Sequence, residues 1–361
     1  MQLTLDDGLV LSGKSFGASK SVKGEVVFST AMTGYVEALT DPSYKGQILV
    51  LTYPLQGNYG VPISGFESKQ IQVQGLVVSH YTEYPSHYKS VQSLGSWLKQ
   101  EGIPAICDLD TRSLTRRLRG LGTCPGSLIT PGVEPTSVKS FLKLVAPQAI
   151  TRSGSGDTRI LLIDTGTKEN IVRCLLERGL QLVRAPWDSS WEDYLSEVDG
   201  VFLTNGPGDP MDARSFIDRV KRLLTIDKPI FGICFGHQLL SLAAGSKTMK
   251  MKFGHRSANQ PVRDLLTNKC YITSQNHGFM VQNESIPRDF QPWFVNLNDG
   301  SNEGIRHLKK PIFSVQFHPE ASPGPHDTAF LFDEFTQLVS QSRQSSRGSE
   351  KVQKLPEVVI L

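Results

Sequence analysis

One cysteine, Cys234, stands where an apolar run ends and a helical pattern begins. The preceding residues, 228–233, predict a buried strand, and the residues from Gln238 onward are spaced as in a helix. A strand, one reactive side chain and a helix form a nucleophile elbow, which holds serine in many hydrolases. Gly232 and Gly236 flank the turn, where side chains would block the close approach of strand and helix. The alternative is a small buried cysteine, but this spacing favours a nucleophilic thiol at the positive end of a helix dipole.

A histidine and a carboxylate that could serve this thiol follow another apolar run, residues 312–317. Pro319 disfavours helical geometry for His318 and biases it towards an extended conformation. Residues i and i+2 of an extended chain point to one side, so His318 and Glu320 can meet. In a Cys-His-carboxylate site the histidine takes and returns the thiol proton, and the carboxylate orients it. The alternative for His318 is a capping or core residue, and for His237 we expect packing rather than catalysis.

A glycine-rich loop, residues 205–210, follows another predicted strand and could assist the thiol. Ligands of parallel sheets bind at the carboxyl ends of the strands, where this loop and Cys234 both fall. The backbone N–H groups of Gly208 and Phe235 could together stabilise an oxyanion. An ordinary β-turn is the alternative for this loop taken alone.

Composition places the chain among soluble globular proteins. Its 361 residues predict two or three domains. The net charge of +3, from 38 basic and 35 acidic residues, gives no indication of nucleic-acid binding. Five cysteines without metal-binding spacing fit a reducing compartment. No apolar stretch is long enough to span a membrane, and the first residues leave no room for a signal peptide, so we expect a cytoplasmic protein without membrane contact.

The first part of the chain, residues 1–145, predicts an α+β domain. Asp6-Asp7-Gly8 between two alternating apolar runs is typical of a β-hairpin. Asp110 is placed to cap the N-terminus of a helix. The further strands expected here are Glu25–Ser29, Ile48–Thr52 and Val73–Ser79, and the helices are Val91–Glu101 and Thr111–Arg119.

After a polar linker, residues 146–158, strands and helices alternate through residue 340. This alternation predicts right-handed crossovers and a mostly parallel, doubly wound α/β sheet. From residue 270 the pattern changes to short strands and turns. The expected strands are Ile160–Ile163, Leu180–Val183, Gly200–Leu203, Pro229–Ile233, Tyr271–Ser274, Phe294–Asn298, Glu303–Arg306 and Ile312–Phe317, and the helices are Lys168–Arg178, Asp212–Thr225 and Asp327–Val339.

The segment Gly232–Gln238, with His318-Pro319-Glu320 starting 84 residues after Cys234, resembles the class I (triad) glutamine amidotransferases. Further motifs narrow the resemblance to the glutaminase (small) part of carbamoyl phosphate synthetases. It covers nearly the whole chain, and the N-terminal domain is special to those enzymes. These motifs are Asn205-Gly-Pro-Gly-Asp-Pro210, Ser274-Gln-Asn-His-Gly-Phe279, Gly24-Glu-Val-Val-Phe28, Thr40-Asp-Pro-Ser-Tyr44, Leu51-Thr-Tyr-Pro54, Gly57-Asn-Tyr-Gly60 and Asp110-Thr-Arg112.

The resemblance implies hydrolysis of L-glutamine through a γ-glutamyl thioester, with Cys234, His318 and Glu320 as the catalytic triad. The ammonia would pass through a tunnel to a synthetase part, which makes carbamoyl phosphate from bicarbonate and ATP. No cofactor or metal is expected in this chain, which has no GxxxxGK[ST] loop, and ATP and Mg belong to the synthetase part. The implied glutamine-binding residues are Ser43, Gly206, Gly208, Phe235, Gln238, Asn276, Gly278 and Phe279.

Two departures from the family pattern stand out. Phe235 takes the place of a common leucine, which keeps the backbone donor but changes the packing over the thioester. Gly254-His-Arg-Ser-Ala-Asn-Gln-Pro261 replaces the commoner Gly-Asn-Arg-Gly-His-Asn-Gln-Pro, so the role of this loop, structural or beside the tunnel, stays open. Some ammonia-using mitochondrial relatives have lost the cysteine. Because Cys234 and Gln238 are both present here, we expect a working glutaminase.

Two other functions are compatible with the C-terminal pattern. One is the glutaminase of another triad amidotransferase, or a γ-glutamyl hydrolase, against which the N-terminal 145 residues argue. The other is a non-catalytic docking subunit, against which the intact triad argues.

The last stretch of the chain, residues 341–361, predicts a linker followed by the start of another domain. Residues 340–351 are polar, and Leu355–Leu361 is rich in β-branched and apolar residues. We interpret Val358–Leu361 as the first strand of a synthetase part fused in cis. The parent would then be of the fused, eukaryotic pyrimidine-pathway type, and a C-terminal edge strand is the alternative.

Overall fold

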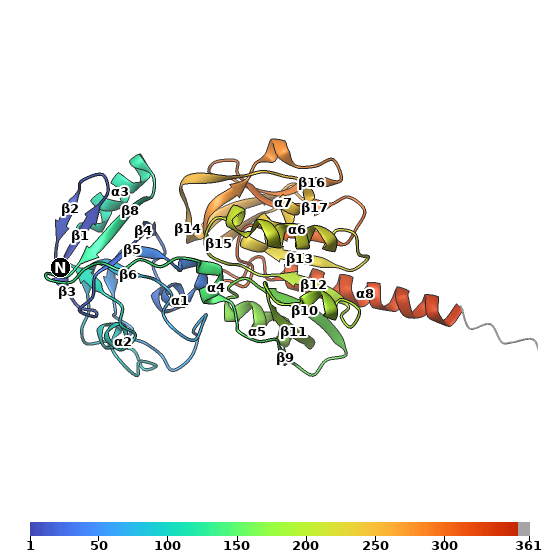
Figure 1. Cartoon of the computed structure of the whole chain (residues 1–361), viewed down its shortest axis with the longest axis horizontal. Coiled ribbons are helices and arrows are strands. Elements are labelled where there is room, and N and C mark those ends of the chain that lie inside the picture. Colours follow the sequence, from blue (N-terminus) through green and yellow to red (C-terminus); the bar gives the residue numbers. More distant parts are fainter. Residues whose placement is uncertain (353–361) are drawn as a thin grey trace, which may run out of the picture.

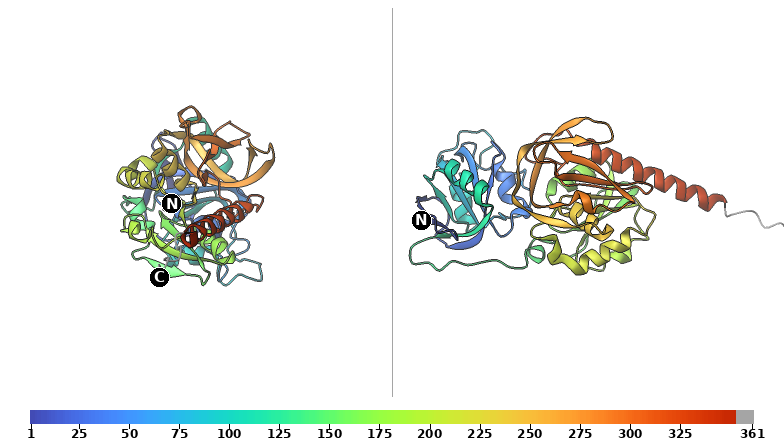
Figure 2. Two further views of the ribbon diagram at one scale, coloured as in Figure 1. Left: turned by 90° about the vertical axis from the view of Figure 1, so that its right-hand side faces the viewer. Right: turned by 90° about the horizontal axis from the view of Figure 1, so that it is seen from above.

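The computed structural model describes residues 1–352, with side chains described through residue 344. Two halves, each built around its own sheet, lie side by side, and helix α8 (Phe330–Val352) projects from the C-terminal half away from the N-terminal half (Figures 1 and 2). No helix in the described part is long and apolar enough to cross a membrane.

The N-terminal half contains a mixed sheet of eight strands in the order β2-β1-β8-β4-β5-β6-β7-β3. Its central strands, β4 to β7, are parallel, and the flanking pairs are antiparallel. The hairpin expected around Asp6–Gly8 is present as β1 and β2. The strands are β1 (Gln2–Leu5), β2 (Val10–Ser12), β3 (Lys14–Ser15), β4 (Val22–Ser29), β5 (Gln47–Gln56), β6 (Gly75–Tyr81), β7 (Ala105–Cys107) and β8 (Cys124–Ile129).

Helices cover both faces of this sheet, because alternate residues of its buried central strands point to opposite sides. Leu49 belongs to a buried cluster with residues of α1 and α2, and Val50 belongs to the cluster on the α3 side. Asp110 caps α3, as expected, with its carboxylate accepting from the Ser113 N–H at 2.8 Å. The helices are α1 (Tyr35–Thr40), η1 (Pro42–Tyr44), α2 (Leu94–Gln100), α3 (Thr111–Leu121) and α4 (Phe141–Val145).

The C-terminal half contains ten strands in the order β15-β14-β16-β17-β18-β13-β12-β10-β11-β9. The segment from β18 to β11 is parallel, with α5 and α8 packed on one face and α6 and α7 on the other. The expected doubly wound α/β architecture is therefore confirmed. The strands are β9 (Thr151–Ser153), β10 (Thr158–Asp164), β11 (Leu180–Pro186), β12 (Gly200–Leu203), β13 (Ile230–Ile233), β14 (Thr248–Asp264), β15 (Cys270–Val281), β16 (Phe290–Asn296), β17 (Asn302–His307) and β18 (Ile312–Val315), and the remaining helices are α5 (Glu169–Glu177), η2 (Trp191–Tyr194), η3 (Pro210–Ala213), α6 (Arg214–Leu223), α7 (Phe235–Ala244) and η4 (Asn283–Ser285).

The longest strand of the protein, β14, was not predicted from the sequence. It pairs with β15, and the pair includes residues 275–279, which lie beyond the end of the expected strand Tyr271–Ser274. The segment around Gly254 is poor in β-branched residues, so its propensity argues against a strand. Two register irregularities, after Lys250 and after Ser257, let the strands pair in spite of this local composition.

Two expected linkers contain regular structure instead. The stretch 146–158 includes β9, an exposed edge strand antiparallel to β11. Helix α8 continues past Val339 to Val352, through residues expected to be a linker. Its hydroxyl side chains bond back into the helix, with Ser340 Oγ donating to the Thr336 carbonyl at 2.9 Å, and no proline occurs before Pro356. The strand expected at Val358–Leu361 lies outside the described residues.

Candidate active site

Cys234 occupies the turn between β13 and α7 with φ 54° and ψ −102°, a conformation that is unusual for a residue with a side chain. The two flanking glycines are required by space. A Cβ on Gly232 would lie 2.8 Å from the Gly236 carbonyl oxygen, and a Cβ on Gly236 would lie 2.3 Å from the Leu203 carbonyl oxygen. The sequence therefore folds here into the strained strand-to-helix turn of a nucleophile elbow, with the Cys234 side chain at its apex.

The structure brings His318 and Glu320 into direct contact, with His318 Nδ1 2.6 Å from Glu320 Oε1. Both side chains are almost completely buried. His318 has the expected extended geometry, in an antiparallel bridge with Ser274, although β18 already ends at Val315. The chain does not stay extended to Glu320, because the Ala321 N–H closes a turn onto the His318 carbonyl. Within the described residues, His318 Nε2 has no hydrogen-bond partner, so this nitrogen is available to a reacting group.

A buried lysine, Lys168, completes the charge pattern of this site. Its Nζ lies 3.0 Å from Glu320 Oε1 and also donates to the Ala321 carbonyl. Burial favours the neutral form of Glu320, but the cations Lys168 and His318 lower its pKa to about 2. Burial likewise opposes the charged form of His318, but the charges of Glu320 and Cys234 raise its pKa to about 10. An ionised carboxylate between two cations therefore lies beside the thiol at neutral pH.

Lys168 had been expected only as the start of a helix. A positive charge at a helix N-terminus is unfavourable, because the helix dipole is also positive there. This unfavourable position was the only local indication in the sequence that Lys168 pairs with a distant carboxylate. The Cys234 thiol itself donates to the Asn276 carbonyl, with the sulfur 3.7 Å from the oxygen.

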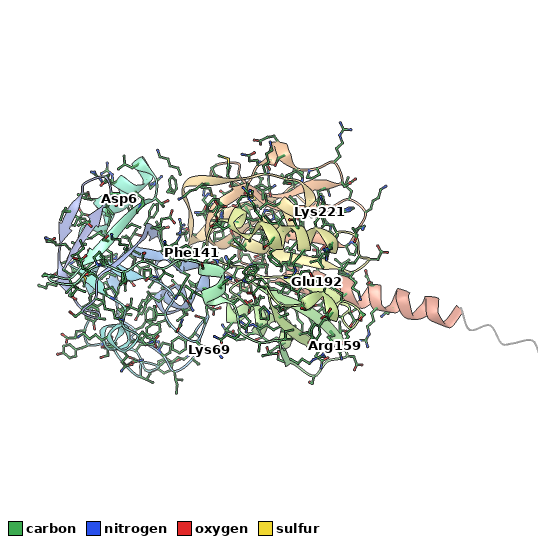
Figure 3. The ribbon with its side chains drawn as sticks, viewed as in Figure 1. Asp6, Lys69, Phe141, Arg159, Glu192 and Lys221 are labelled. Carbon is green, nitrogen blue, oxygen red and sulfur yellow. The ribbon has the colours of Figure 1, made fainter. Side chains whose placement is uncertain are left out.

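A cavity of about 700 Å³ opens at Cys234 between the two halves. The aromatic ring of Phe141, which Figure 3 labels at the junction of the halves, contributes to its wall. All eight residues that the resemblance implies for glutamine binding line this cavity: Ser43, Gly206, Gly208, Phe235, Gln238, Asn276, Gly278 and Phe279.

Hydrogen bonds between the two halves hold several of these residues. Asn205 Nδ2 donates to Ser43 Oγ at 2.9 Å, and Asn276 Nδ2 donates to Asp41 Oδ2 at 2.8 Å. The other oxygen of Asp41 accepts from the Ser43 N–H at 2.9 Å. Gln238 Nε2 donates to the Phe279 carbonyl at 3.0 Å. The N-terminal half is therefore part of the cavity wall. Asn205 positions Ser43 and Asp41 positions Asn276, and neither of these two hydrogen bonds was predicted from the sequence.

Glu67, a fully buried carboxylate of the N-terminal half, joins the halves close to the triad. It accepts from the Asn170 N–H at 2.9 Å, from Ser322 Oγ at 2.6 Å and from the Arg173 guanidinium at 2.5 Å. The Asn170 side chain in turn donates to the Glu320 carbonyl. Glu67 could not be predicted from the sequence, since nothing near it along the chain indicates partners more than 100 residues away.

His237 is enclosed in the C-terminal half and contacts Ser314, a setting that fits the expected packing residue. Its side chain is fully buried, and Nδ1 is 2.9 Å from Ser314 Oγ. Burial lowers its pKa to about 3, so the ring is neutral at physiological pH. Arg256, from the loop whose role was open, is buried beside the cavity and donates from Nη1 to the Phe253 carbonyl at 2.7 Å.

Comparison with known proteins gives two family matches. The class I glutamine amidotransferase family matches residues 161–338, and the carbamoyl-phosphate synthase small chain family, in its CPSase domain, matches residues 3–128. The second match favours a carbamoyl phosphate synthase part over other triad amidotransferases.

Full-length relatives extend these matches. The carbamoyl phosphate synthase small chain of Methanocaldococcus jannaschii is 48% identical, over 93% of this chain and 98% of the relative. The arginine-specific small chain of Saccharomyces cerevisiae is 47% identical, over 96% of this chain and 90% of the relative. The multifunctional protein URA2 of the same yeast is 46% identical over 94% of this chain, which spans only 17% of that relative. Taken with the elbow and its cavity, these matches show that the chain belongs to the family of carbamoyl phosphate synthase small chains, the glutamine amidotransferase component of that enzyme.

Proposed function

We propose that this chain hydrolyses L-glutamine to glutamate and ammonia for carbamoyl phosphate synthesis. The observation that carries the proposal is the position of Cys234. Cys234 lies at the apex of a nucleophile elbow, beside the buried His318–Glu320 pair. It also lines a cavity that is large enough for an amino acid. The family to which the chain belongs supports the same function.

The reaction begins from the pair in which the proton of the Cys234 thiol already lies on His318 Nε2, the charge state that the raised pKa of His318 favours, and the thiolate sulfur attacks the side-chain amide carbon of glutamine. The resulting oxyanion accepts hydrogen bonds from the N–H groups of Gly208 and Phe235. The imidazolium then gives its proton to the leaving nitrogen, which departs as ammonia, and a γ-glutamyl thioester remains. Water, deprotonated by His318, attacks the thioester, and the sulfur leaves to regenerate the thiol and release glutamate.

Glu320 acts through His318. Its Oε1 accepts a hydrogen bond from the Nδ1–H of His318, so Nε2 is the nitrogen that exchanges the proton, and the charge of Glu320 stabilises the imidazolium. Lys168 keeps this carboxylate ionised and fixed in place. Ser43, Gly206, Gly208, Phe235, Gln238, Asn276, Gly278 and Phe279 bind the glutamine, since all of them line the cavity.

The ammonia goes to a synthetase part, in the pyrimidine or arginine pathway. Relatives of this chain are separate small chains or parts of multifunctional proteins, so the synthetase part is either a large subunit or, as we propose, fused in cis. Residues 1–145 form the docking domain, 146–158 connect it to the amidotransferase domain of residues 159–340, and 341–361 lead to the synthetase part. ATP and Mg belong to that part, glutamine hydrolysis by this chain needs no cofactor, and the protein is cytoplasmic.

Purified chain and glutamine labelled with ¹⁵N at the amide test this function. We expect slow release of labelled ammonia without ATP, and no carbamoyl phosphate when ATP, Mg and bicarbonate are added. The variant Cys234→Ala should abolish ammonia release while keeping the circular dichroism spectrum of the native chain. Ammonia release by Cys234→Ala at a rate near that of the native chain would refute the mechanism, and carbamoyl phosphate made by the chain alone would refute the division of labour.

A further inference from the structure

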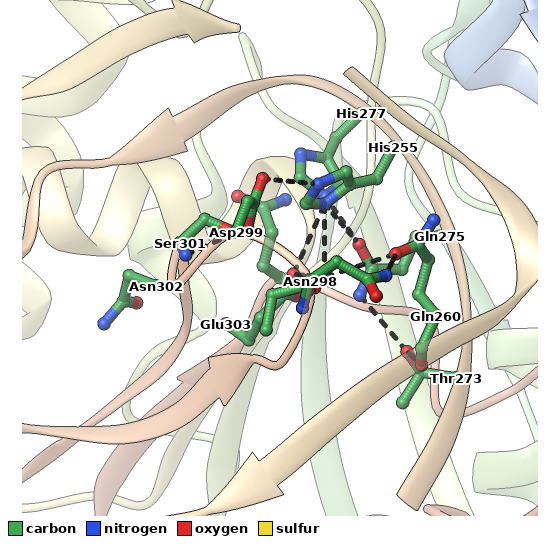
Figure 4. Close-up of polar contacts among 12 residues, drawn as sticks. His255, Gln260, Thr273, Gln275, His277, Asn298, Asp299, Ser301, Asn302 and Glu303 are labelled. Atoms are coloured by element: carbon green, nitrogen blue, oxygen red, sulfur yellow. Dashed lines mark hydrogen bonds and ion pairs between the residues drawn. The ribbon is translucent and has the colours of Figure 1, made fainter.

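Two histidines and a glutamate meet next to the glutamine cavity, whose lining includes His277, and Figure 4 shows their side chains. His255 lies on β14, His277 on β15 and Glu303 on β17. One ligand atom from each side chain lies within 4.8 Å of the others, and all three residues are buried, Glu303 completely. His255 and His277 are direct cross-strand partners whose rings stand nearly perpendicular, with centroids 5.0 Å apart.

Each of these histidines has one ring nitrogen held by an acceptor. His255 Nε2 lies 2.9 Å from Asp299 Oδ2, and His277 Nδ1 lies 2.8 Å from the Phe279 carbonyl. A carboxylate and a carbonyl can only accept here, so these two nitrogens carry the hydrogens. In the neutral rings, His255 Nδ1 and His277 Nε2 then present lone pairs. Metal-bound histidines in proteins are oriented by just such outer carboxylate and carbonyl acceptors.

The nearest polar atom to both lone pairs is a third acceptor, and among the described residues the donor beside His255 Nδ1, Asn296 Nδ2, lies farther away at 3.5 Å. Both His255 Nδ1 and His277 Nε2 lie 2.9 Å from Gln275 Oε1. The amide is held in this orientation because Gln275 Nε2 donates to Thr273 Oγ1, whose own hydroxyl donates to the Gln260 carbonyl.

The glutamate adds to this surplus of acceptors. Glu303 Oε1 lies 3.4 Å from His255 Nδ1 and accepts from Asn296 Nδ2 at 2.9 Å. Glu303 Oε2 has no hydrogen-bond partner among the described residues, although the side chain is fully buried. A buried carboxylate oxygen without a partner is costly. The cluster therefore gathers nitrogen and oxygen lone pairs around one point, which favours a positive charge there.

We propose that this cluster binds a divalent transition metal, with zinc as the best fit. The ligands are His255 Nδ1, His277 Nε2 and the Glu303 carboxylate, with Gln275 Oε1 in the fourth position. Two imidazoles and a carboxylate are an established zinc donor set, whereas magnesium and calcium prefer oxygen alone. Tetrahedral ligands about 2.1 Å from zinc stand about 3.4 Å apart, so shifts of about 1 Å would close the site.

Such a metal would be structural. It would tie together β14, β15 and β17 next to Asn276, Gly278 and Phe279 of the cavity wall. The alternative to a metal is a second proton on His255. The charged ring would then donate to Asp299 from Nε2 and to Glu303 from Nδ1.

Metal titration of the full chain tests the site. After dialysis against a chelator, Co²⁺ and Zn²⁺ are added and followed by calorimetry and, for Co²⁺, by visible absorption. We expect one equivalent to bind, with d–d bands of a tetrahedral site and no thiolate-to-cobalt charge-transfer band. His255→Asn and Glu303→Gln should weaken binding at least about 10–100-fold. The matched control His80→Asn, which changes an exposed histidine, should bind as the native chain does.

The same titration of Cys234→Ala separates this site from a metal held by the catalytic thiol. Retained binding in Cys234→Ala supports the proposal, as does a melting temperature that zinc raises in the native chain and not in a folded His255→Asn. Loss of binding in Cys234→Ala, equal binding in His255→Asn, or no saturable binding to the native chain would overturn it. The last result would assign the cluster to a proton shared by His255 and the two carboxylates.

Discussion

Replacing Glu320 by glutamine removes the charge of this side chain and keeps its shape. Glu320 Oε1 accepts from two donors, His318 Nδ1 at 2.6 Å and Lys168 Nζ at 3.0 Å. The amide oxygen of Glu320→Gln should take this place, because both partners donate, so the histidine keeps its tautomer. The variant therefore tests the charge alone.

Two effects of different size follow from the lost charge. The imidazolium that forms during the reaction loses its counter-ion, so we expect the rate of glutamine hydrolysis to fall about 10²-fold, at the lower end of general-base contributions. Lys168 becomes a buried cation without its carboxylate, which costs about 3–5 kcal/mol of stability. The double variant Glu320→Gln/Lys168→Met removes both charges, so it should regain most of this stability and none of the rate.

The pH dependence of unfolding gives a second measure of the same charge. The pKa of Glu320 in the folded chain, about 2, lies below its ordinary value of 4.5. Between these pH values the unfolded chain binds more protons, so the contribution of Glu320 to stability is present above about pH 4.5 and is lost as the pH falls towards 2. The double variant should lack this part of the acid dependence.

The assays are glutamate release at saturating glutamine and urea unfolding at fixed pH. If the double variant recovered rate and stability together, the role of Glu320 would be structural and its action on the His318 proton would be refuted. A rate for Glu320→Gln equal to that of the native chain would refute the same reasoning.

Three further variants test other parts of the site. His318→Asn should lower kcat about 10⁴-fold, more than Glu320→Gln, because it removes the base itself, whereas His237→Asn should change kcat little; the opposite order would transfer the role to His237. Gly236→Ala should lower the melting temperature, because its Cβ would lie 2.3 Å from a carbonyl oxygen; an unchanged melting temperature would contradict the elbow geometry. Asp41→Asn should raise KM for glutamine about 10-fold with a smaller change in kcat, because the Asn276 amide loses its acceptor; an unchanged KM would contradict the role of the N-terminal half.

The elbow and the His318–Glu320 pair could be predicted because their cause is local. The space that requires Gly232 and Gly236 is created by the turn at Cys234, two residues from each of them. His318 and Glu320 are only two residues apart, so they can make contact without a distant segment of the chain. The parallel pairing around β13 could be predicted in the same way from the alternating strands and helices, since a crossover helix joins parallel strands.

The remaining features depend on contacts between distant segments. Lys168 meets Glu320 across 152 residues, and Glu67 meets Arg173 across 106. No spacing in the sequence encodes such pairs. Strand β14 escaped prediction for a related reason, because its residues are poor strand formers and its pairing with β15 compensates for them.

The central claim is that glutamine hydrolysis passes through a thioester on Cys234. The most direct measurement is rapid acid quenching of the chain during turnover with glutamine, followed by proteolysis and mass spectrometry of the cysteine-containing peptides. We predict one γ-glutamyl group on the peptide that contains Cys234, absent when the quench precedes glutamine and absent in Cys234→Ser, which cannot form a thioester. Steady ammonia release with no adduct on Cys234, or an adduct on one of the other four cysteines, would contradict this mechanism.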